Sequence, residues 1–397
     1  MTAESSFDPT APLAGPPEPW AFASAPSLRG GPPYHLTDMI AAEPAVARRI
    51  LVRTAESGAA AELASAIRAA ADAGAPVVVT GCGTSETAGH GMVEIFREAF
   101  HAAGLAGATV VTEQAFELSL DPPGRGLVIG VSHEGGTSAT NSALRAARAA
   151  GARTAVVTVS RHSPAAAFAD LVVETGELDH SWCHSIGYVS PMLVAAAAGA
   201  ALSGRPLDAD RVAAMMTAGA RAVAAAEGIG ARLADATHLV VIGSGADRPA
   251  GREMALKVEE ASWLPSGYRD LETFLHGHLP ATGPDTGLVL ILADRHGRAE
   301  RLVRARQALA AARVIGLRAA AILGADLDAD LAAELTPAGR LLVDDDPALP
   351  APVACLFGTA TALQLVTERL ARARGKNPDL IRRQDERYRR AAEVSGG

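Results

Sequence analysis

The chain has 397 residues, of which 49% are apolar, a formal net charge of −8 and a pI near 5.8. This length and apolar content allow two domains with separate cores, and the acidic balance argues against a nucleic-acid partner. Three cysteines without a CxxC pair argue against a disulfide framework or a zinc ribbon and indicate a reducing compartment. The apolar stretch MLVAAAAGAALSG is too short to span a membrane and the first residues lack a secretory pattern, so we expect a cytoplasmic protein without a membrane partner.

The N-terminal part of the chain divides into an arm and a helix. Residues 1–34 are rich in Pro, Ala, Gly and Ser without a period, which predicts a disordered or loosely packed arm. The segment 34–51, YHLTDMIAAEPAVARRIL, predicts a helix with Thr37 as its N-cap and a break at Glu43–Pro44.

The rest of the chain alternates between short apolar runs and Ala-rich helical stretches. Uninterrupted apolar strands between helices are typical of parallel sheets that helices cover on both faces. The predicted strands are 76–80, 126–131, 154–159, 170–175, 238–243, 287–292, 318–323 and 340–345.

The two halves of the chain resemble each other. VVVTGCGTSETAGHGM at 77–92 and LVVIGSGADRPAGREM at 239–254 share Gly81/Gly243, Gly83/Gly245 and three further positions at one constant offset. The sequence therefore predicts an α/β fold of two similar doubly wound domains, 35–205 and 206–397, each with a loop at the carboxyl end of its first strand.

Two loops of the first half have the composition of an anion site. GCGTS follows the strand 76–80 and SHEGGT (132–137) follows the strand 126–131, and both combine glycine with hydroxyl residues before a helix. The third glycine of a dinucleotide fingerprint is replaced by Glu86 in the first half and by Arg248 in the second, which disfavours a dinucleotide cofactor. A tight strand-to-helix turn that binds nothing is the alternative interpretation.

These motifs, followed by ALKVEE and HG, resemble the SIS (sugar isomerase) domain proteins, especially the isomerase half of glucosamine-6-phosphate synthase and the amino-sugar phosphate deaminase/isomerases. The likeness runs from about Leu36 to about Asp379, with no counterpart of a glutaminase half. It implies tandem SIS domains that bind a sugar or sugar phosphate, catalyse aldose–ketose proton transfer without a cofactor, and assemble as a homodimer or larger homo-oligomer.

The resemblance also implies the site residues. Glu260 matches the carboxylate that moves the proton, and His276 matches the histidine associated with ring opening. Glu253 and Lys257 share a helix face with Glu260, and Lys257 is one of only two lysines in the chain. The residues that match or replace substrate ligands are Gly83, Thr84, Ser85, Ser132, His133, Glu134 and Thr137.

The chain departs from the family in its ligand loops. His133 and Glu134 replace residues that are commonly glutamine and serine, and a carboxylate repels a phosphate unless a cation neutralises it. The family's C-terminal lysine has no counterpart, although Arg382, Arg383 and Arg387 can supply fixed charge. Glu134 is therefore expected to face the ligand, either paired with an arginine or bonded to a hydroxyl or ammonium group. The alternative is a solvated loop residue that points away from the site.

The segment ELDHSWCHSIGY replaces a small hydroxyl-rich loop of the family. Its His180, Cys183 and His184 permit a metal site as an alternative, although their spacing does not suit one helix face, and we expect no metal. A second function also stays open, namely a non-catalytic regulator that binds a sugar phosphate with the same fold. The identity of the sugar and the choice between isomerase and deaminase are not fixed by these residues.

Overall fold

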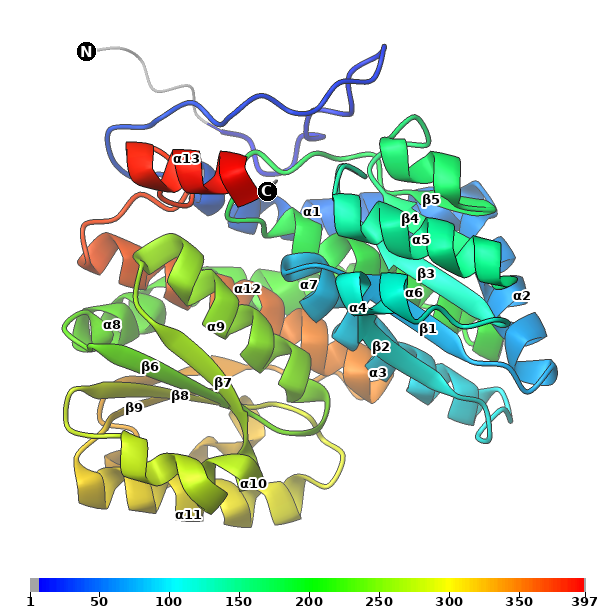
Figure 1. The fold of residues 1–397 in the computed structure, drawn as a ribbon. Coiled ribbons are helices and arrows are strands. Elements are labelled where there is room, and N and C mark those ends of the chain that lie inside the picture. The colour runs from blue at the N-terminus through cyan, green and yellow to red at the C-terminus, as the bar shows by residue number, and fades with distance from the viewer. Residues whose placement is uncertain (1–6, 396–397) are drawn as a thin grey trace.

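The computed structural model describes residues 7–395 and contains two parallel five-stranded sheets, each with helices on both faces (Figure 1). The first sheet has the order β2-β1-β3-β4-β5 and the second the order β10-β9-β8-β6-β7, which is the same order counted from the opposite edge. Every strand pair is parallel. The predicted α/β fold with two similar doubly wound sheets is confirmed.

The first half contains the elements α1 (His35–Glu56), α2 (Ala59–Asp72), β1 (Val77–Gly81), α3 (Thr84–Ala102), β2 (Val110–Gln114), α4 (Ala115–Leu120), β3 (Leu127–Val131), α5 (Ser138–Ala150), β4 (Arg153–Thr158), η1 (Pro164–Phe168), β5 (Leu171–Glu174) and α6 (Ile186–Ser203). The second half contains α7 (Ala209–Arg221), α8 (Val223–Leu233), β6 (His238–Gly243), η2 (Gly245–Asp247), α9 (Arg248–Ser262), β7 (Ser266–Asp270), α10 (Leu271–Thr273), η3 (Phe274–His278), η4 (Leu279–Ala281), β8 (Thr286–Leu292), α11 (Arg298–Ile315), β9 (Arg318–Gly324), η5 (Ala325–Asp330), η6 (Ala333–Leu335), β10 (Gly339–Val343), α12 (Ala351–Ala373) and α13 (Glu386–Ser395).

All eight strands predicted from apolar runs are present, but the prediction missed β2 and β7. Both lie at a sheet edge, next to β1 and β6 respectively. Their sequences, VVTEQ and SGYRD, are partly polar, and most of their residues are not fully buried. An edge strand with one neighbour needs no continuous apolar run, so the pattern that identified the central strands is absent here.

The repeated glycines have the same backbone role in both halves. Gly83 and Gly245 each follow the first strand of their sheet with positive φ values of 56° and 62°, a conformation that favours glycine. A Cβ on Gly81 would lie 2.8 Å from the backbone of Ser85, and one on Gly243 would lie 2.6 Å from Asp247 O. Each loop therefore turns tightly from strand to helix, and the two turns are structurally equivalent.

Helix α1 differs from the prediction at its start and in its interior. It begins at His35 with Tyr34 as N-cap, not Thr37, and it continues through Pro44 without a break. The amides of His35 and Leu36 donate to the carboxylate of Asp379, each at 2.9 Å. Packing of α1 against α6 and α7 offsets the backbone hydrogen bond that proline removes.

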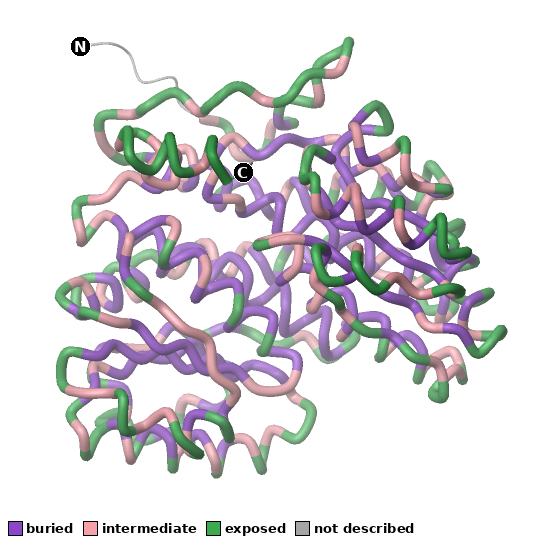
Figure 2. Tube along the Cα trace, in the orientation of Figure 1, coloured by how far each residue is buried: buried purple, intermediate pink, exposed green. Residues whose placement is uncertain are grey.

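Helix α12 connects the two halves. Its first turns contribute Val353, Leu356 and Phe357 to the core of the first sheet, whereas Leu363, Val366 and Leu370 belong to a core of the second. Figure 2 shows that this helix and the central strands are buried. The predicted boundary at 205/206 separates the two sheets, and we keep it as a proposal because α12 packs against both.

The apolar helix α6 is longer than the apolar stretch from which its length was judged in the sequence. All 18 residues of Ile186–Ser203 are helical with a mean hydropathy of 1.5, which by length and composition is enough to cross a membrane. However, 78% of this helix is buried inside the protein, where it packs mainly against α3. It is therefore the core helix of the first half.

The N-terminal arm, by which we mean residues 7–34, has no helix or strand, yet it lies against the folded chain (Figure 1). Leu13 is buried in the first core, and the amide of Leu178 donates to Ala14 O at 3.0 Å. Residues 1–6 of the predicted arm lie outside the described residues. The described arm is thus attached to the first half at defined points.

Candidate active site

The loops after β1 and β3 meet at one cavity of about 640 Å³. The strand order places these loops at the point where the chain leaves the sheet in opposite directions, which is where open α/β sheets bind ligands. The residues that line this cavity are Phe22, Cys82, Gly83, Thr84, Ser85, Ser132, His133, Glu134, Gly136, Thr137, Ser138, Ala139, Trp182, His184, Glu260, Ile381 and Arg383.

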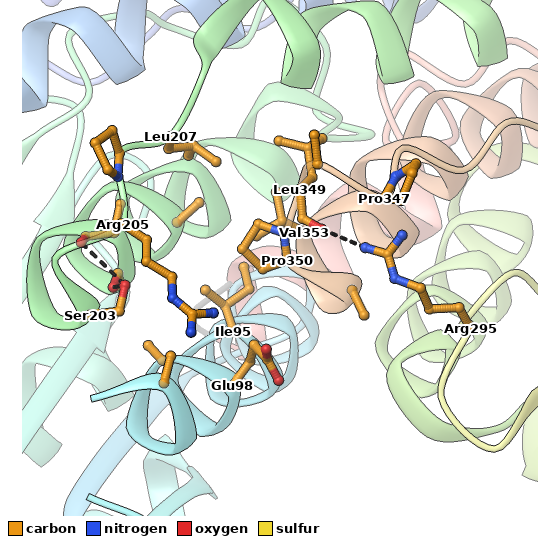
Figure 3. A pocket seen from close by; sticks show the side chains of 18 of the residues that line it. Ile95, Glu98, Ser203, Arg205, Leu207, Arg295, Pro347, Leu349, Pro350 and Val353 are labelled. Carbon is orange, nitrogen blue, oxygen red and sulfur yellow. Dashed lines mark hydrogen bonds between the residues drawn. The ribbon is translucent and has the colours of Figure 1, made fainter. Parts of the chain in front are cut away.

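A second cavity, of about 320 Å³, lies between α3, α6 and the start of α12 (Figure 3). Its polar lining includes Glu98, Arg205 and Arg295, and Arg295 is already bonded to Asp345 and to Leu349 O. None of the predicted site residues lines it. We therefore place the candidate active site in the larger cavity.

Two helix N-termini border the larger cavity. Thr84 is the first residue of α3 and Ser138 is the first residue of α5, so both helix N-termini lie at the same place. In α3 the amides of Ser85 and Glu86 already donate to Cys82 O and Gly83 O. The hydroxyls of Ser132 and Thr137 lie 3.4 Å apart across the second loop. Paired N-termini with adjacent hydroxyls attract an anion or the hydroxyls of a sugar.

A buried lysine connects helix α9 to the first loop. Lys257 Nζ donates to Glu260 Oε2 and to Thr84 Oγ1, each at 2.6 Å, and lies 3.7 Å from Glu253 Oε1. Lys257 is 2% exposed and the Glu253 side chain is fully buried, whereas the Glu260 side chain keeps 23% of its surface and lines the cavity. The structure thus brings the three predicted α9 residues and Thr84 into one cluster.

The cluster changes the protonation of its members. Burial raises the pKa of Glu253 to about 7, against the opposing pull of Lys257 and of a hydrogen bond from Thr87. Burial alone would lower the pKa of Lys257, but the carboxylates of Glu260 and Glu253 outweigh it and raise that pKa above its ordinary value. Lys257 therefore stays charged, and Glu260 has a permanent cationic partner.

The histidines of the second and third loops are neutral. Burial lowers the pKa of His133 to about 4 and the pKa of His184 to about 3. Their rings lie edge to face with centroids 5.3 Å apart, and His133 Nε2 accepts the amide of Asp179 at 3.0 Å. That bond turns His133 toward the third loop, so His133 shapes the cavity wall and offers no positive charge there.

The third loop is held by a carboxylate. Asp179 accepts the amides of Ser181, Ser185 and Gly187 at 2.8–3.2 Å. Cys183 is fully buried, and burial raises the pKa of its thiol far above the usual value. Within residues 7–395 no group of three or more His, Cys, Asp and Glu side chains is arranged to hold a metal ion.

Glu134 faces the cavity and forms no ion pair with an arginine within residues 7–395. Burial raises its pKa, and its Oε2 accepts the amide of Ala23 in the N-terminal arm at 2.7 Å. Arg383 lines the cavity and stacks over Trp182 at 5.0 Å, without an ion pair to Glu134 in the described part of the chain. Among the described residues the expected pairing with an arginine is therefore not formed, and the position of Glu134 in the cavity lining also disagrees with a solvated residue that points away.

His276 lies away from this cavity within one chain. Its imidazole is 67% exposed and contacts Glu272, with Nδ1 3.0 Å from Oε1. It sits in the distorted segment η3 after β7, where Gly277 has a φ of 126°. Within one chain His276 is therefore not part of the cavity lining.

The equivalent position of the second half is filled by its own side chains. Asp247 accepts the amides of Ala293 and Asp294 at 2.8 and 3.0 Å, and Asp294 accepts the amide of Ala246 at 2.9 Å. Arg301 pairs with Asp294 at 2.7 Å and lies where a Cβ on Gly245 would be. The second-half counterpart of the candidate site is therefore occupied by contacts within the chain.

Some cavity residues were not predicted as ligands. Phe22 and Trp182 come from the arm and the third loop, which lack a regular period, whereas Arg383 of the C-terminal segment was named in the sequence as a source of fixed charge. The clustering of His180, Trp182, Cys183 and His184 in one short loop was the one signal that this segment is unusual. Ile381 and Arg382 beside Arg383 have positive φ values of 42° and 68°, a backbone feature that no sequence pattern announced.

The structure is that of a tandem α/β protein with two similar doubly wound sheets and a cavity at the loops of the first sheet. The SIS domain family model matches residues 71–202 and 232–324, which is more than half of the chain. The protein belongs to the SIS domain family. No curated protein sequence matches it.

Solved structures share this fold at low sequence identity. The C-terminal domain of glucosamine-fructose-6-phosphate aminotransferase from Francisella tularensis is 17% identical with a TM-score of 0.71, over 89% of this chain and 99% of that one. Tagatose-6-phosphate ketose/aldose isomerase from Escherichia coli is 18% identical with a TM-score of 0.64, over 90% and 98%. Glucosamine-6-phosphate deaminase from Thermotoga maritima is 17% identical with a TM-score of 0.56, over 77% and 87%. At these identities the likeness establishes the fold alone.

Proposed function

We propose that the protein is a cytoplasmic enzyme that binds a phosphosugar or amino sugar and transfers a proton between adjacent carbons, as an isomerase or a deaminase/isomerase. The observation that carries this proposal is the hydrogen-bonded link Thr84–Lys257–Glu260 at the wall of the cavity. It joins an anion-binding helix terminus to a partly exposed carboxylate. The two segments that match the SIS domain model contain Thr84 and Glu260 respectively, which supports the proposal.

Each group has a role in this proposal. Glu260 removes the proton beside the substrate carbonyl and returns it one carbon away, as one carboxylate can when the sugar is held open. Lys257 orients Glu260 through their hydrogen bond, and Glu253 faces the charge of Lys257 from the buried side. The proposed substrate-binding groups are Gly83, Thr84, Ser85, Ser132, His133, Glu134 and Thr137.

Replacement of Glu260 tests the proposed base. Glu260→Gln keeps the size and the hydrogen bond to Lys257 but removes the basic oxygen, so turnover of the active sugar should fall by roughly 10²–10⁴-fold. Binding of the same sugar should persist in calorimetry. The matched control is Glu259→Gln on the neighbouring, exposed position of α9. Near-normal turnover in Glu260→Gln would rule out Glu260 as the base.

We also propose a homodimer or larger assembly in which His276 of one subunit completes the site of another. The exposure of His276 and its distance from the cavity within one chain support this arrangement. Mixtures of Glu260→Gln and His276→Ala chains should recover activity that neither variant has alone. A fully active monomer in light scattering would contradict the shared site.

A non-catalytic sugar-phosphate-binding protein is the second candidate. The exposed position of His276 favours it, because one chain by itself lacks the group proposed for ring opening. The two candidates differ in turnover, not in binding. The assembled protein is tested with a panel of phosphorylated and free amino sugars. If sugars of this panel bind and none is converted, the result selects this candidate.

A further inference from the structure

We propose that the N-terminal arm forms one wall of the candidate cavity and thereby limits the size of its ligand, with Glu134 as the residue that fastens the arm. The inference rests on the proposed function only in taking this cavity as the ligand site. It gives Glu134 a positioning role, and it makes Phe22 a specificity-determining residue that the sequence did not reveal.

The first observation is the bond between Glu134 and the arm. Glu134 Oε2 accepts the amide of Ala23 at 2.7 Å, across 111 residues of sequence. A hydrogen bond from an amide to a carboxylate is about twice as strong as one between neutral groups. Within residues 7–395 this carboxylate has no ion pair, so the arm provides its bonding partner.

The second observation is the fit of Phe22 against the glycines of the loop. A Cβ on Gly136 would lie 2.4 Å from Phe22 Cε1, so any larger residue would displace the ring. Trp20 lies edge to face with Phe22 at 6.0 Å and supports it from within the arm. The second glycine of SHEGGT thus makes room for an aromatic side chain of the arm.

The third observation is that the arm is anchored on both sides of this point. Before Phe22, Glu18 lies 2.8 Å from His162 Nδ1 and the Leu178 amide bonds to the arm. After it, Asn377 Nδ2 donates to Arg29 O at 3.0 Å. The arm is therefore fixed on both sides of Phe22. Its middle part can move away from the cavity only if the hydrogen bond between Glu134 and Ala23 breaks.

The fourth observation is a further cavity that the N-terminal arm lines. It has a volume of about 500 Å³, and it shares Phe22, Glu134 and Trp182 with the candidate active site. These three side chains form the partition between the two spaces. A ligand with a bulky substituent beyond the sugar needs this partition to open, whereas a small phosphosugar fits without it.

Cys82 offers a probe of this wall that needs no ligand. It lines the candidate cavity and is partly exposed, whereas Cys183 and Cys355 are buried at 0% and 4% exposure. The rate at which N-ethylmaleimide labels Cys82 in the full-length protein therefore reports how open the cavity is. Mass spectrometry of peptides identifies the labelled cysteine.

Ala23→Pro removes the donated N–H and leaves the side chains of the cavity unchanged. We expect it to accelerate Cys82 labelling about tenfold, the effect of losing one charge-assisted hydrogen bond. Phe22→Ala should accelerate labelling as well. Ala23→Ser keeps the N–H and should label at the wild-type rate.

The second pair of variants changes Glu134, the acceptor of this hydrogen bond. Glu134→Ala should match Ala23→Pro, and Glu134→Gln, which still accepts a hydrogen bond, should fall between it and the wild type. Unchanged labelling in Ala23→Pro and Phe22→Ala would overturn the inference, and so would equal acceleration in Ala23→Ser. Since labelling uses no sugar, these results stand whether or not the protein turns over a phosphosugar.

Discussion

The buried carboxylate Glu253 should give the protein a marked pH dependence of stability. Its folded-state pKa is about 7, raised by burial from the ordinary 4.5. Glu253 therefore binds its proton more tightly in the folded protein than in the unfolded chain, and protonation of Glu253 stabilises the fold. This stabilisation is complete below the unfolded pKa and is lost as the pH rises through 7. The shift corresponds to about 3 kcal/mol of unfolding free energy.

Glu253→Gln removes the titrating group and still accepts the hydrogen bond from Thr87. Urea unfolding at about pH 5 and about pH 8 measures the effect, and the stability lost between these pH values should be smaller in the variant than in the wild type by about 2–3 kcal/mol. Glu62→Gln on the exposed face of α2 is the matched control and should keep the wild-type profile. An unchanged pH profile in Glu253→Gln would refute the reasoning about this buried cluster.

Three further predictions follow from named contacts. Lys257→Met leaves two carboxylates without their cation and should lower the free energy of unfolding by about 3–5 kcal/mol at neutral pH. If urea unfolding shows a loss below about 1 kcal/mol, the ion pair of Lys257 and Glu260 is solvated and not buried. Gly81→Ala places a Cβ 2.8 Å from the Ser85 backbone and should cost about 1–3 kcal/mol, whereas Gly107→Ala meets nothing within 4 Å and should be neutral; equal thermal shifts would contradict this. Thr84→Val removes a hydroxyl at the cavity and should weaken binding of fructose 6-phosphate roughly tenfold in calorimetry, and unchanged affinity would remove Thr84 from the site.

The sequence predicted the parts of the fold that depend on continuous burial. The central strands are apolar throughout because helices cover both faces, and the repeated glycines mark turns that leave no room for a Cβ. The edge strands β2 and β7 have one strand neighbour each and therefore lack this pattern. The start of α1 depends on Asp379, which is 344 residues from His35 along the chain, and no local motif encodes that contact.

The site was predictable where a residue lies on a regular element. Glu253, Lys257 and Glu260 share one face of α9, and the structure places them in one bonded cluster. Phe22 and Arg383 reach the cavity from segments without a period, so only the folded chain shows that they line it. His276 was matched to the family by its motif, and its exposure shows that the motif alone did not place it in the cavity.

The removal of a carbon-bound proton by Glu260 is the central claim, and exchange of that proton with solvent tests it most directly. In D₂O, nuclear magnetic resonance follows deuterium entering the carbon beside the carbonyl of fructose 6-phosphate, glucosamine 6-phosphate and related sugars. We predict that the wild-type assembly incorporates deuterium into at least one of them and that Glu260→Gln does so roughly 10²–10⁴-fold more slowly. Equal incorporation by the wild type and the variant, or none with any sugar that binds, would contradict the assignment of Glu260 as the proton-transferring base.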